Sequence, residues 1–335
     1  MKLRVGVVGV GDTWESRHRL ALLSLSDKFE IRAVCCDVAQ RAEQVAREFK
    51  AAVVDGYRSL TVREDIDVVL MLAPGWYGAL PILAACDAGK AVYCAAALDL
   101  DADRLYEVKD RIEESGIAFM AELPRRHAPA TLRLKELIAT RLGNPKLLFC
   151  HRRQPVVKQG RDAKQIQDGT RDFIELVDWC RYVVGSDPTS VFGVAHREAE
   201  GTLQCDYRMM SLDFSEAGSP GAGPLAQISC GEYMPATWSE AIAFRPPAAL
   251  QVACDRGIAF IDLPATLIWF DEAGRHMESL ESERPVGEQM LTHFHRAVTS
   301  LVRKSSDLGD AYRAVQIVVS AQRSAESGVR VLIDD

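Results

Sequence analysis

Short apolar runs alternate with amphipathic stretches over the first part of the chain, and this rhythm predicts repeated strand–helix units. Leu3–Val10 is almost continuously apolar, as expected for a strand buried on both faces of a sheet. Ala39–Phe49 instead places its apolar residues at helical spacing. Further strands are predicted at Ile31–Cys35, Val68–Leu72, Ala91–Cys94 and Ile117–Met120, with helices at Leu80–Ala88 and Asp101–Ser115. Such alternation is typical of a parallel α/β sheet.

The alternation of strands and helices ends beyond Met120, and this change predicts a second domain of another fold class. Helices are predicted at Pro129–Arg141 and Thr170–Val184, and the polar stretch Gln154–Asp168 is predicted to be a loop. Weakly alternating strands are predicted at Lys146–His151, Ser190–Val194, Arg208–Phe214, Ala226–Cys230, Leu250–Cys254, Ile258–Leu263 and Leu267–Phe270. Two amphipathic helices close the chain. We therefore expect an α+β domain with an open, mainly antiparallel sheet and helices on one side.

Composition argues against several classes of protein. The 335 residues carry a net charge of −7 with no basic block, which argues against a nucleic-acid partner. The nine cysteines include no CxxC pair, so we expect reduced thiols, no metal site and a cytoplasmic location. Val68–Ala85 lacks charge, but prolines and glycines interrupt it, so no membrane span or membrane partner is predicted. The short apolar N-terminus does not resemble a signal peptide.

A glycine pair follows the first predicted strand and precedes a helix. Gly9 and Gly11 would let the backbone turn tightly and approach a pyrophosphate. Asp37 follows the second strand, where a carboxylate can bind a ribose hydroxyl and favour NAD over NADP. Trp14 and Glu15 stand where a third small residue is usual, so a tight turn with weak or lost cofactor binding is the alternative.

Several segments in order along the chain resemble the glucose–fructose oxidoreductase, inositol dehydrogenase and MocA (Gfo/Idh/MocA) family. They are Gly6–Gly11 followed by His18, Asp65–Val69, Ala73-Pro74, Ala88–Cys94, Pro124–Arg126, Leu134–Ile138 and Ala325–Leu332. The resemblance implies a doubly wound Rossmann domain at residues 1–122 that binds NAD or NADP, with Ala73 and Pro74 beside the cofactor. It also implies a substrate and oligomerisation domain at residues 123–335, whose last helices are candidates to pack back on the first domain.

Family members move a hydride between NAD(P) and a sugar or polyol, and the reacting hydroxyl needs a proton donor or base. The resemblance assigns that role to the Lys of an EKP motif and to an Asp-x-x-x-His pair. Ala96 stands at the lysine position, Arg171 at the aspartate and Glu175 at the histidine. Because alanine cannot transfer a proton, no residue is assigned a catalytic role, and we expect the usual reaction to be absent or weak.

Arg171 and the aromatic residues near the predicted cleft each have two possible roles. Arg171 and Glu175 are four residues apart on a predicted helix, so they can pair with each other. Arg171 can instead bind a carboxylate or phosphate of a ligand. Trp14, Trp76 and Tyr77 are candidates either to line a substrate cleft or to fill volume left by missing polar groups.

Three classes of function are compatible with this sequence. The first is an NAD(P)-dependent oxidoreductase with rearranged catalytic residues. The second is an inactive homologue that senses a cofactor or ligand, and the third is a non-redox enzyme on the same fold. Expected partners are a small molecule (a sugar, a polyol or an anionic derivative) and, by the resemblance, further copies of the chain. A free sheet face would allow such a homo-oligomer.

Overall fold

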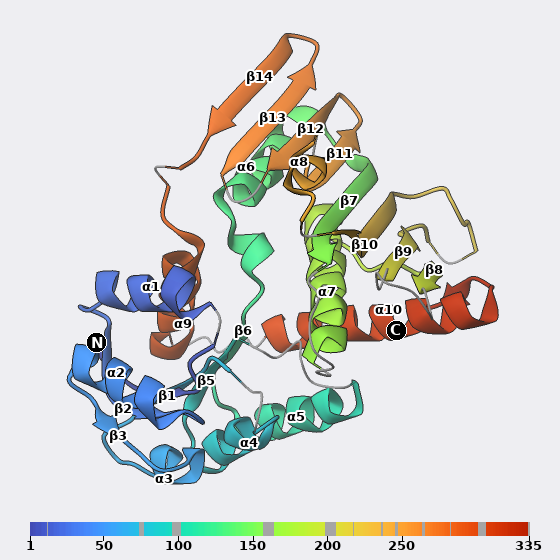
Figure 1. The fold of residues 1–335 in the computed structure, drawn as a ribbon. Helices are drawn as coiled ribbons and strands as arrows, with labels where there is room; N and C mark the ends of the chain where they lie inside the picture. The colour runs from blue at the N-terminus through green and yellow to red at the C-terminus, as the bar shows by residue number, and fades with distance from the viewer. Residues whose placement is uncertain are drawn as a thin grey trace. The chain divides into compact units, whose positions relative to one another are not determined.

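The computed structural model places most of the chain (Figure 1). It describes residues 1–11, 13–73, 77–95, 102–156, 164–197, 206–216, 218–235, 237–244, 247–262, 265–281, 283–300 and 306–333. These residues form two compact units. The first unit comprises Met1–Pro124 and Arg284–Arg313, and the second comprises Arg125–Glu283 and Ala314–Asp335.

The first unit contains a six-stranded parallel sheet of order β3-β2-β1-β4-β5-β6. Its strands are β1 (Leu3–Val8), β2 (Phe29–Cys35), β3 (Ala52–Val53), β4 (Val68–Met71), β5 (Ala91–Cys94) and β6 (Phe119–Ala121). The strand order reverses between β1 and β4. In open α/β sheets ligands bind at such a switch point, at the carboxyl ends of the strands. The predicted Rossmann sheet is confirmed.

Helices cover this sheet and one of them comes from the far end of the sequence. They are the π-helical turn η1 (Trp14–His18) and α1 (Arg19–Ser24), α2 (Ala39–Phe49), α3 (Tyr57–Thr61), α4 (Leu80–Asp87), α5 (Ala102–Ser115) and α9 (Val286–Thr299). Met290, Leu291 and Phe294 of α9 are fully buried in the same apolar core as Leu3 and Val5 of β1. The N-terminal sheet therefore depends for its packing on residues close to the other end of the chain.

The second unit contains a nine-stranded sheet of order β14-β13-β12-β11-β7-β10-β9-β8-β15. Its strands are β7 (Pro145–Val156), β8 (Ser190–Arg197), β9 (Asp206–Asp213), β10 (Leu225–Pro235), β11 (Leu250–Cys254), β12 (Gly257–Asp262), β13 (Thr266–Asp271), β14 (Gly274–Ser279) and β15 (Val331–Leu332). Only β7 and β10 pair in parallel among these described strands. The predicted mainly antiparallel sheet is confirmed, and Asp255-Arg256-Gly257 forms the hairpin between β11 and β12.

The helices and turns of this unit are η3 (Pro124–His127), α6 (Pro129–Leu137), η4 (Ile138–Leu142), α7 (Lys164–Val184), α8 (Ser239–Ala243) and α10 (Ser306–Ser327), whose residues up to Arg313 belong to the first unit. Three of these helices pack on one face of the sheet. α6 contacts β12 and β13, and α7 contacts β7 and β10. Gly193 of β8 lies so close to α10 that a Cβ there would be 2.1 Å from the carbonyl oxygen of Ala321. Glycine at this position therefore lets helix and strand approach each other.

Two predictions about this unit were wrong. The helix α7 begins at Lys164, inside the stretch Gln154–Asp168 that was predicted to be a loop, and β7 runs to Val156. Lysine and glutamine are good helix formers, so a polar sequence does not separate a solvated helix from a loop. The strand β14 was not predicted at all, because Gly274–Ser279 is a polar edge strand with a weak apolar pattern. Residues 157–163 lie outside the described residues.

Among the helices that the structure describes, none is both long enough and apolar enough to cross a bilayer.

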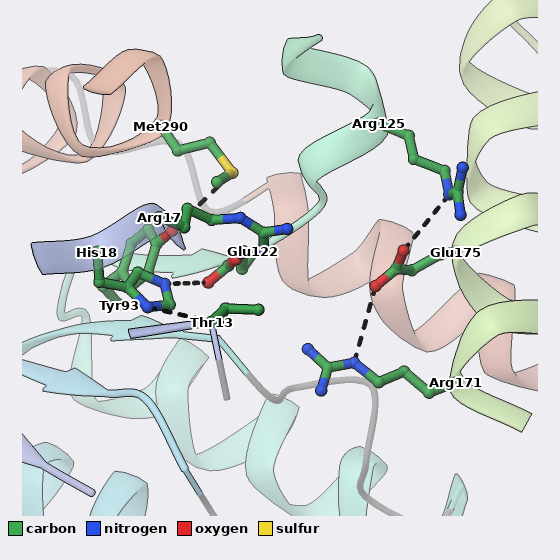
Figure 2. A network of polar contacts seen from close by, with 9 residues as sticks. All are labelled: Thr13, Arg17, His18, Tyr93, Glu122, Arg125, Arg171, Glu175 and Met290. Carbon is green, nitrogen blue, oxygen red and sulfur yellow. Dashed lines mark hydrogen bonds and ion pairs between the residues drawn. The ribbon is translucent and has the colours of Figure 1, made fainter. Parts of the chain in front are cut away.

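A buried ionic network ties the first helical turn to the last strand of the parallel sheet (Figure 2). Glu122, which directly follows β6, has a completely buried side chain. It accepts hydrogen bonds from Nη1 of Arg17 and from Nε2 of His18, the latter at 2.8 Å. Beside it, the buried hydroxyl of Tyr93 contacts Met290 Sδ at 3.9 Å. Four segments distant in sequence thus meet around one carboxylate.

The charge on Glu122 is set by two opposing effects. Burial would raise the pKa of this carboxyl group, because a low-dielectric interior disfavours the ionised form. The hydrogen bonds and charges of His18 and Arg17 outweigh burial and lower the pKa of Glu122 to about 2. The carboxylate is therefore ionised at neutral pH, as expected for a group that accepts hydrogen bonds from two N–H donors.

This network predicts how the stability of the first unit depends on pH. The pKa of Glu122 is about 2 in the folded protein, against an ordinary value of 4.5, so its stabilisation is complete above about pH 4.5. That stabilisation, about 3 kcal/mol, should disappear as the pH falls from about 4.5 to about 2. Urea unfolding across this range, followed by circular dichroism, measures the effect.

The Glu122→Gln variant separates this contribution from general acid denaturation. At neutral pH it should lower the free energy of unfolding by about 3 kcal/mol, because Arg17 loses its buried partner. It should also weaken the decline below pH 4.5. Glu15→Gln, in the same turn but with a 69% exposed side chain, is the control and should leave stability nearly unchanged. Equal effects of the two substitutions would contradict the assignment.

Candidate functional site

The two glycines after β1 lie tightly against the end of β4. Gly9 adopts a positive φ of 79°, and its N–H donates to the carbonyl of Cys35 at 2.7 Å. A Cβ on Gly9 would lie 2.6 Å from the carbonyl oxygen of Ala73, and one on Gly11 would lie 2.5 Å from that of Leu72. Only glycine fits at these two positions. The turn therefore lies at the switch point of the sheet, with Ala73 packed against it.

Asp37 lies on the surface just beyond β2, where a ribose-binding carboxylate was predicted. Its Oδ1 accepts hydrogen bonds from the Cys36 thiol and from the N–H of Val38, both at 3.0 Å. These contacts lower the pKa of Asp37, with the thiol as the largest cause. The carboxylate is thus ionised at neutral pH, and its contacts are with residues adjacent in sequence. Arg41 reaches the carbonyl of Val10 in the glycine turn at 3.5 Å.

The aromatic candidates differ in how deeply they are buried. Trp14 is only 3% exposed and packs edge-to-face on Phe49 at 6.0 Å, so it fills the core and is not available to line a cleft. Tyr77 is half-buried and packs edge-to-face on Tyr57 at 5.2 Å. Burial raises the pKa of Tyr77, and the adjacent Cys35 thiol raises it further. Pro74, Trp76 and Ala96 lie outside the described residues.

The predicted ion pair between Arg171 and Glu175 is confirmed, but it has a third member. Glu175 Oε1 lies 3.7 Å from Nε of Arg171 one helical turn away, and its Oε2 lies 3.4 Å from Nε of Arg125 on η3. Figure 2 shows the two guanidinium groups approaching the carboxylate from opposite sides. The sequence did identify the PRR segment that contains Arg125, but gave no sign of this contact because η3 and α7 are far apart in sequence.

The next arginine has a different partner. Arg126 donates from Nε to Asp178 Oδ2 at 2.7 Å and from Nη2 to Asp178 Oδ1, a two-point pairing. Arg181 also approaches Asp178 at 3.6 Å and binds Asp187 at 2.6 Å. The side chain of Asp178 is 2% exposed. This set of charges holds η3 against α7, and its geometry is that of a structural clamp.

A further polar group lies on the sheet face beneath α7, and sequence reasoning missed it. Register places Arg152 of β7 and Arg208 of β9 on either side of Cys230 of β10. Arg152 binds Asp172 of α7 at 2.5 Å, and Arg208 contacts the hydroxyl of Thr170 at 3.3 Å. Burial raises the pKa of the Cys230 thiol to about 12, so this thiol is unreactive. The available signal was an arginine at one end of each predicted strand, since Arg152 directly follows Lys146–His151 and Arg208 begins Arg208–Phe214.

Within the described ranges, no three His, Cys, Asp or Glu side chains come together in a way that could hold a metal ion.

The chain matches a family model over part of its length. The model describes an oxidoreductase family with an NAD-binding Rossmann fold, Gfo/Idh/MocA, and matches residues 3–122. Inositol 2-dehydrogenase 3 of Saccharopolyspora erythraea is 30% identical over 186 residues, or 53% of this chain and 54% of that protein. D-xylose 1-dehydrogenase (NADP+) 2 of Haloferax volcanii is 31% identical over 119 residues, 35% of this chain and 37% of that protein. The chain therefore aligns with about half of the inositol dehydrogenase's length and with a smaller share of the xylose dehydrogenase's.

Solved structures extend the similarity of fold to both units. Levoglucosan dehydrogenase in complex with NADH and levoglucosan superposes with a TM-score of 0.83 at 17% identity and covers 100% of both chains. An oxidoreductase of Thermotoga maritima gives a TM-score of 0.81 at 19% identity, covering 99% of this chain and 98% of that one. At these identities the comparison shows the fold alone. The family match over residues 3–122 and this shared fold together support a relationship to the Gfo/Idh/MocA oxidoreductase family.

Proposed function

We propose that the protein binds NAD in preference to NADP, and that the usual hydride transfer to or from a sugar or polyol is absent or very slow. The observation that carries the cofactor proposal is the tight turn at Gly9 and Gly11 with an ionised carboxylate, Asp37, exposed at the end of the neighbouring strand. Both features suit a dinucleotide. The turn would bring backbone N–H groups to the pyrophosphate, and Asp37 would accept hydrogen bonds from a ribose.

The preference for NAD follows from charge. A 2′-phosphate would bring negative charge next to Asp37, which is itself negative. The bound nicotinamide would supply the hydride-carrying group, and the protein would position it. Glycine packing against Ala73 also supports a rigid turn, which is the part of the site that the cofactor needs.

The loss of the usual chemistry rests on three positions given by family resemblance. Ala96 replaces the lysine, and Arg171 and Glu175 replace the aspartate and histidine. Glu175 lies between two guanidinium groups, those of Arg125 and Arg171, at 3.4 and 3.7 Å. Positioned acid–base groups typically contribute a factor of about 10²–10⁴ to rate, so their loss should leave little activity.

We further propose a homo-oligomer formed through the sheet face that α6, α7 and α10 leave uncovered. Register places a set of apolar side chains on that face, exposed in the single chain by between 37% and 60%. They are Leu147, Phe192, Val194, Leu225, Phe270 and Met277. An exposed sheet face normally carries polar residues, so a patch of this kind marks an interaction surface. The free cysteines of the described chain fit the proposed cytoplasmic location.

The cofactor proposal predicts a measurable selectivity. Titration with NADH and NADPH, followed by protein fluorescence, should show tighter binding of NADH. Asp37→Asn should weaken NADH binding about ten-fold, because a charged hydrogen bond is lost. It should also reduce the difference in affinity between NADH and NADPH. Asp65→Asn, which removes a surface carboxylate paired with Arg63, is the matched control and should change neither affinity. No response to either nucleotide at millimolar concentration would contradict the proposal.

The activity proposal predicts a nearly inactive wild-type protein. With NAD and inositol, turnover should lie at least about 100-fold below that of the Saccharopolyspora erythraea relative, because the proton-transferring groups are replaced. Ala96→Lys should increase turnover, whereas Ala97→Lys, with the same charge one position later, should not. Initial rates of NADH formation measure both variants. Robust wild-type turnover on inositol or simple sugars would overturn the proposal.

The oligomer proposal predicts that charge on the open sheet face breaks the assembly. Leu147→Glu should shift the protein toward monomer in size-exclusion chromatography with light scattering, because burying an unpaired carboxylate in an interface is costly. Val62→Glu, at a 72% exposed position in the first unit, is the control and should not change the mass. A monomeric wild-type protein, or the same mass for both variants, would contradict the assignment of this face.

A further inference from the structure

Thr13 directly precedes the turn η1, but its hydroxyl does not cap that turn. Threonine is common at such a position because its side-chain oxygen normally accepts a hydrogen bond from a backbone N–H of the first turn. The Thr13 side chain makes no capping bond, and its hydroxyl oxygen lies 3.5 Å from Nδ1 of His18. This distance exceeds the usual range of about 2.7–3.2 Å, so the hydroxyl is only loosely held. Helix capping therefore does not account for this hydroxyl.

His18 connects the hydroxyl to the buried carboxylate of Glu122 (Figure 2). Its side chain is 1% exposed, and Nε2 lies 2.8 Å from Oε2 of Glu122. The ionised carboxylate can only accept a hydrogen bond, so Nε2 must carry a proton. A neutral imidazole has a single N–H, so Nδ1 of a neutral ring accepts from Thr13. Carboxylate, imidazole and hydroxyl thus form a continuous polar chain.

This polar chain ends beside the glycine turn. Thr13 is two residues after Gly11, and a hydrogen bond of 3.0 Å from the N–H of Trp14 to the carbonyl of Gly11 closes the turn across it. Thr13 is half-buried, whereas the side chains of His18 and Glu122 are almost completely buried. The hydroxyl is therefore the one group of the three that a ligand at the turn can reach.

A pyrophosphate at this turn would reverse the direction of hydrogen bonding. Its ionised oxygens have no proton to donate, so Thr13 could bond to one only by donating its own hydroxyl proton. Nδ1 of His18 would then need a proton, taken up from water, to donate to the Thr13 oxygen. The ring would become an imidazolium, and the ionised Glu122 at 2.8 Å would stabilise its charge. Binding would therefore be accompanied by uptake of a proton.

We propose that Thr13 binds the pyrophosphate of the dinucleotide through its hydroxyl, and that His18, oriented by Glu122, positions this hydroxyl and takes up a proton when the ligand binds. Thr13 is then a cofactor-binding residue, and His18 is a positioning residue that does not touch the ligand. The inference deepens the proposed function and rests on dinucleotide binding at the glycine turn. It adds that the affinity falls as the pH rises, because the complex holds one more proton than the free protein.

The titratable groups around His18 in the described structure keep their charge between about pH 5 and 8, where histidines normally titrate. Glu122 stays ionised, because its pKa is about 2. Tyr93 of β5, whose ring meets that of His18 edge-to-face at 6.3 Å, stays neutral because burial raises the pKa of its hydroxyl well above the ordinary value. Arg17 stays charged, and α9 contributes the uncharged Met290. A proton taken up in this range is therefore assigned to His18.

Calorimetric titration of the full-length protein tests the proposal. The probes are NADH, ADP-ribose, which has the pyrophosphate but no nicotinamide, and adenosine, which has neither. Each is titrated in two buffers of different ionisation enthalpy, and the difference in heat gives the number of protons taken up. NADH and ADP-ribose should each take up as much as one proton, with affinities that fall by up to about ten-fold per pH unit between about pH 6 and 8. Adenosine should take up none.

Matched substitutions separate ligand binding from a structural contact. Thr13→Val removes the hydroxyl but keeps the side-chain shape, so it should weaken NADH binding about ten-fold and abolish proton uptake. Thr13→Ser keeps the hydroxyl and should retain both. His18→Gln should remove the pH dependence, and if this variant does not fold, the two Thr13 variants still decide. His295→Gln is the control and should change nothing, since His295 of the same unit bonds to the carbonyl of Met1 at 2.8 Å.

The same titrations distinguish this inference from the cofactor proposal. Purely structural roles for Thr13 and His18 would lower the stability of the variants and leave the number of protons unchanged. Binding of NADH without proton uptake, or with the same uptake in Thr13→Val, therefore overturns the inference alone. If neither NADH nor ADP-ribose binds at millimolar concentration, both proposals are overturned.

Discussion

The buried carboxylate of Glu122 is the constraint on which the geometry of the first unit depends. It follows β6 at the edge of the parallel sheet, while its partners Arg17 and His18 lie on η1, which follows β1. The glycine turn connects β1 to η1 and is therefore fixed at both ends. Its start is bonded to β2 through Gly9, and the turn after it is anchored by Glu122. Buried ion pairs are weak sources of net stability but strong sources of fixed geometry when every partner is satisfied.

This constraint affects how strongly each residue of the predicted cofactor site argues for cofactor binding. Gly9 and Gly11 would be required even without a ligand, because their missing Cβ atoms let the turn pack against Ala73 and Leu72. The glycines alone are thus evidence for a tight turn. Asp37 is independent evidence, because it is exposed and bonds to residues beside it in sequence. An ionised carboxylate at the end of β2 is therefore the more informative half of the predicted site.

The elements that could be predicted are those whose pattern is local. The bounds of α2, β5 and β11 agree with the sequence prediction, because helical spacing or a short apolar run marks each of them. The start of α7 and the strand β14 could not be predicted, since neither begins with apolar residues. Trp14 illustrates a different limit. The sequence shows that Trp14 is large and apolar but not where its ring lies. Its packing against Phe49 places it in the core.

The charged residues follow the same division between local and distant contacts. Arg171 and Glu175 are one helical turn apart, so their pairing could be predicted from spacing alone. His18 and Glu122 are separated by 104 positions, and no sequence pattern connects them. Arg125 and Arg126 show why this matters for function. The two are identical neighbours in sequence, yet one is neutralised at two points by Asp178 and the other shares a loosely placed Glu175. How well each arginine is paired is therefore a property that composition and motif do not record.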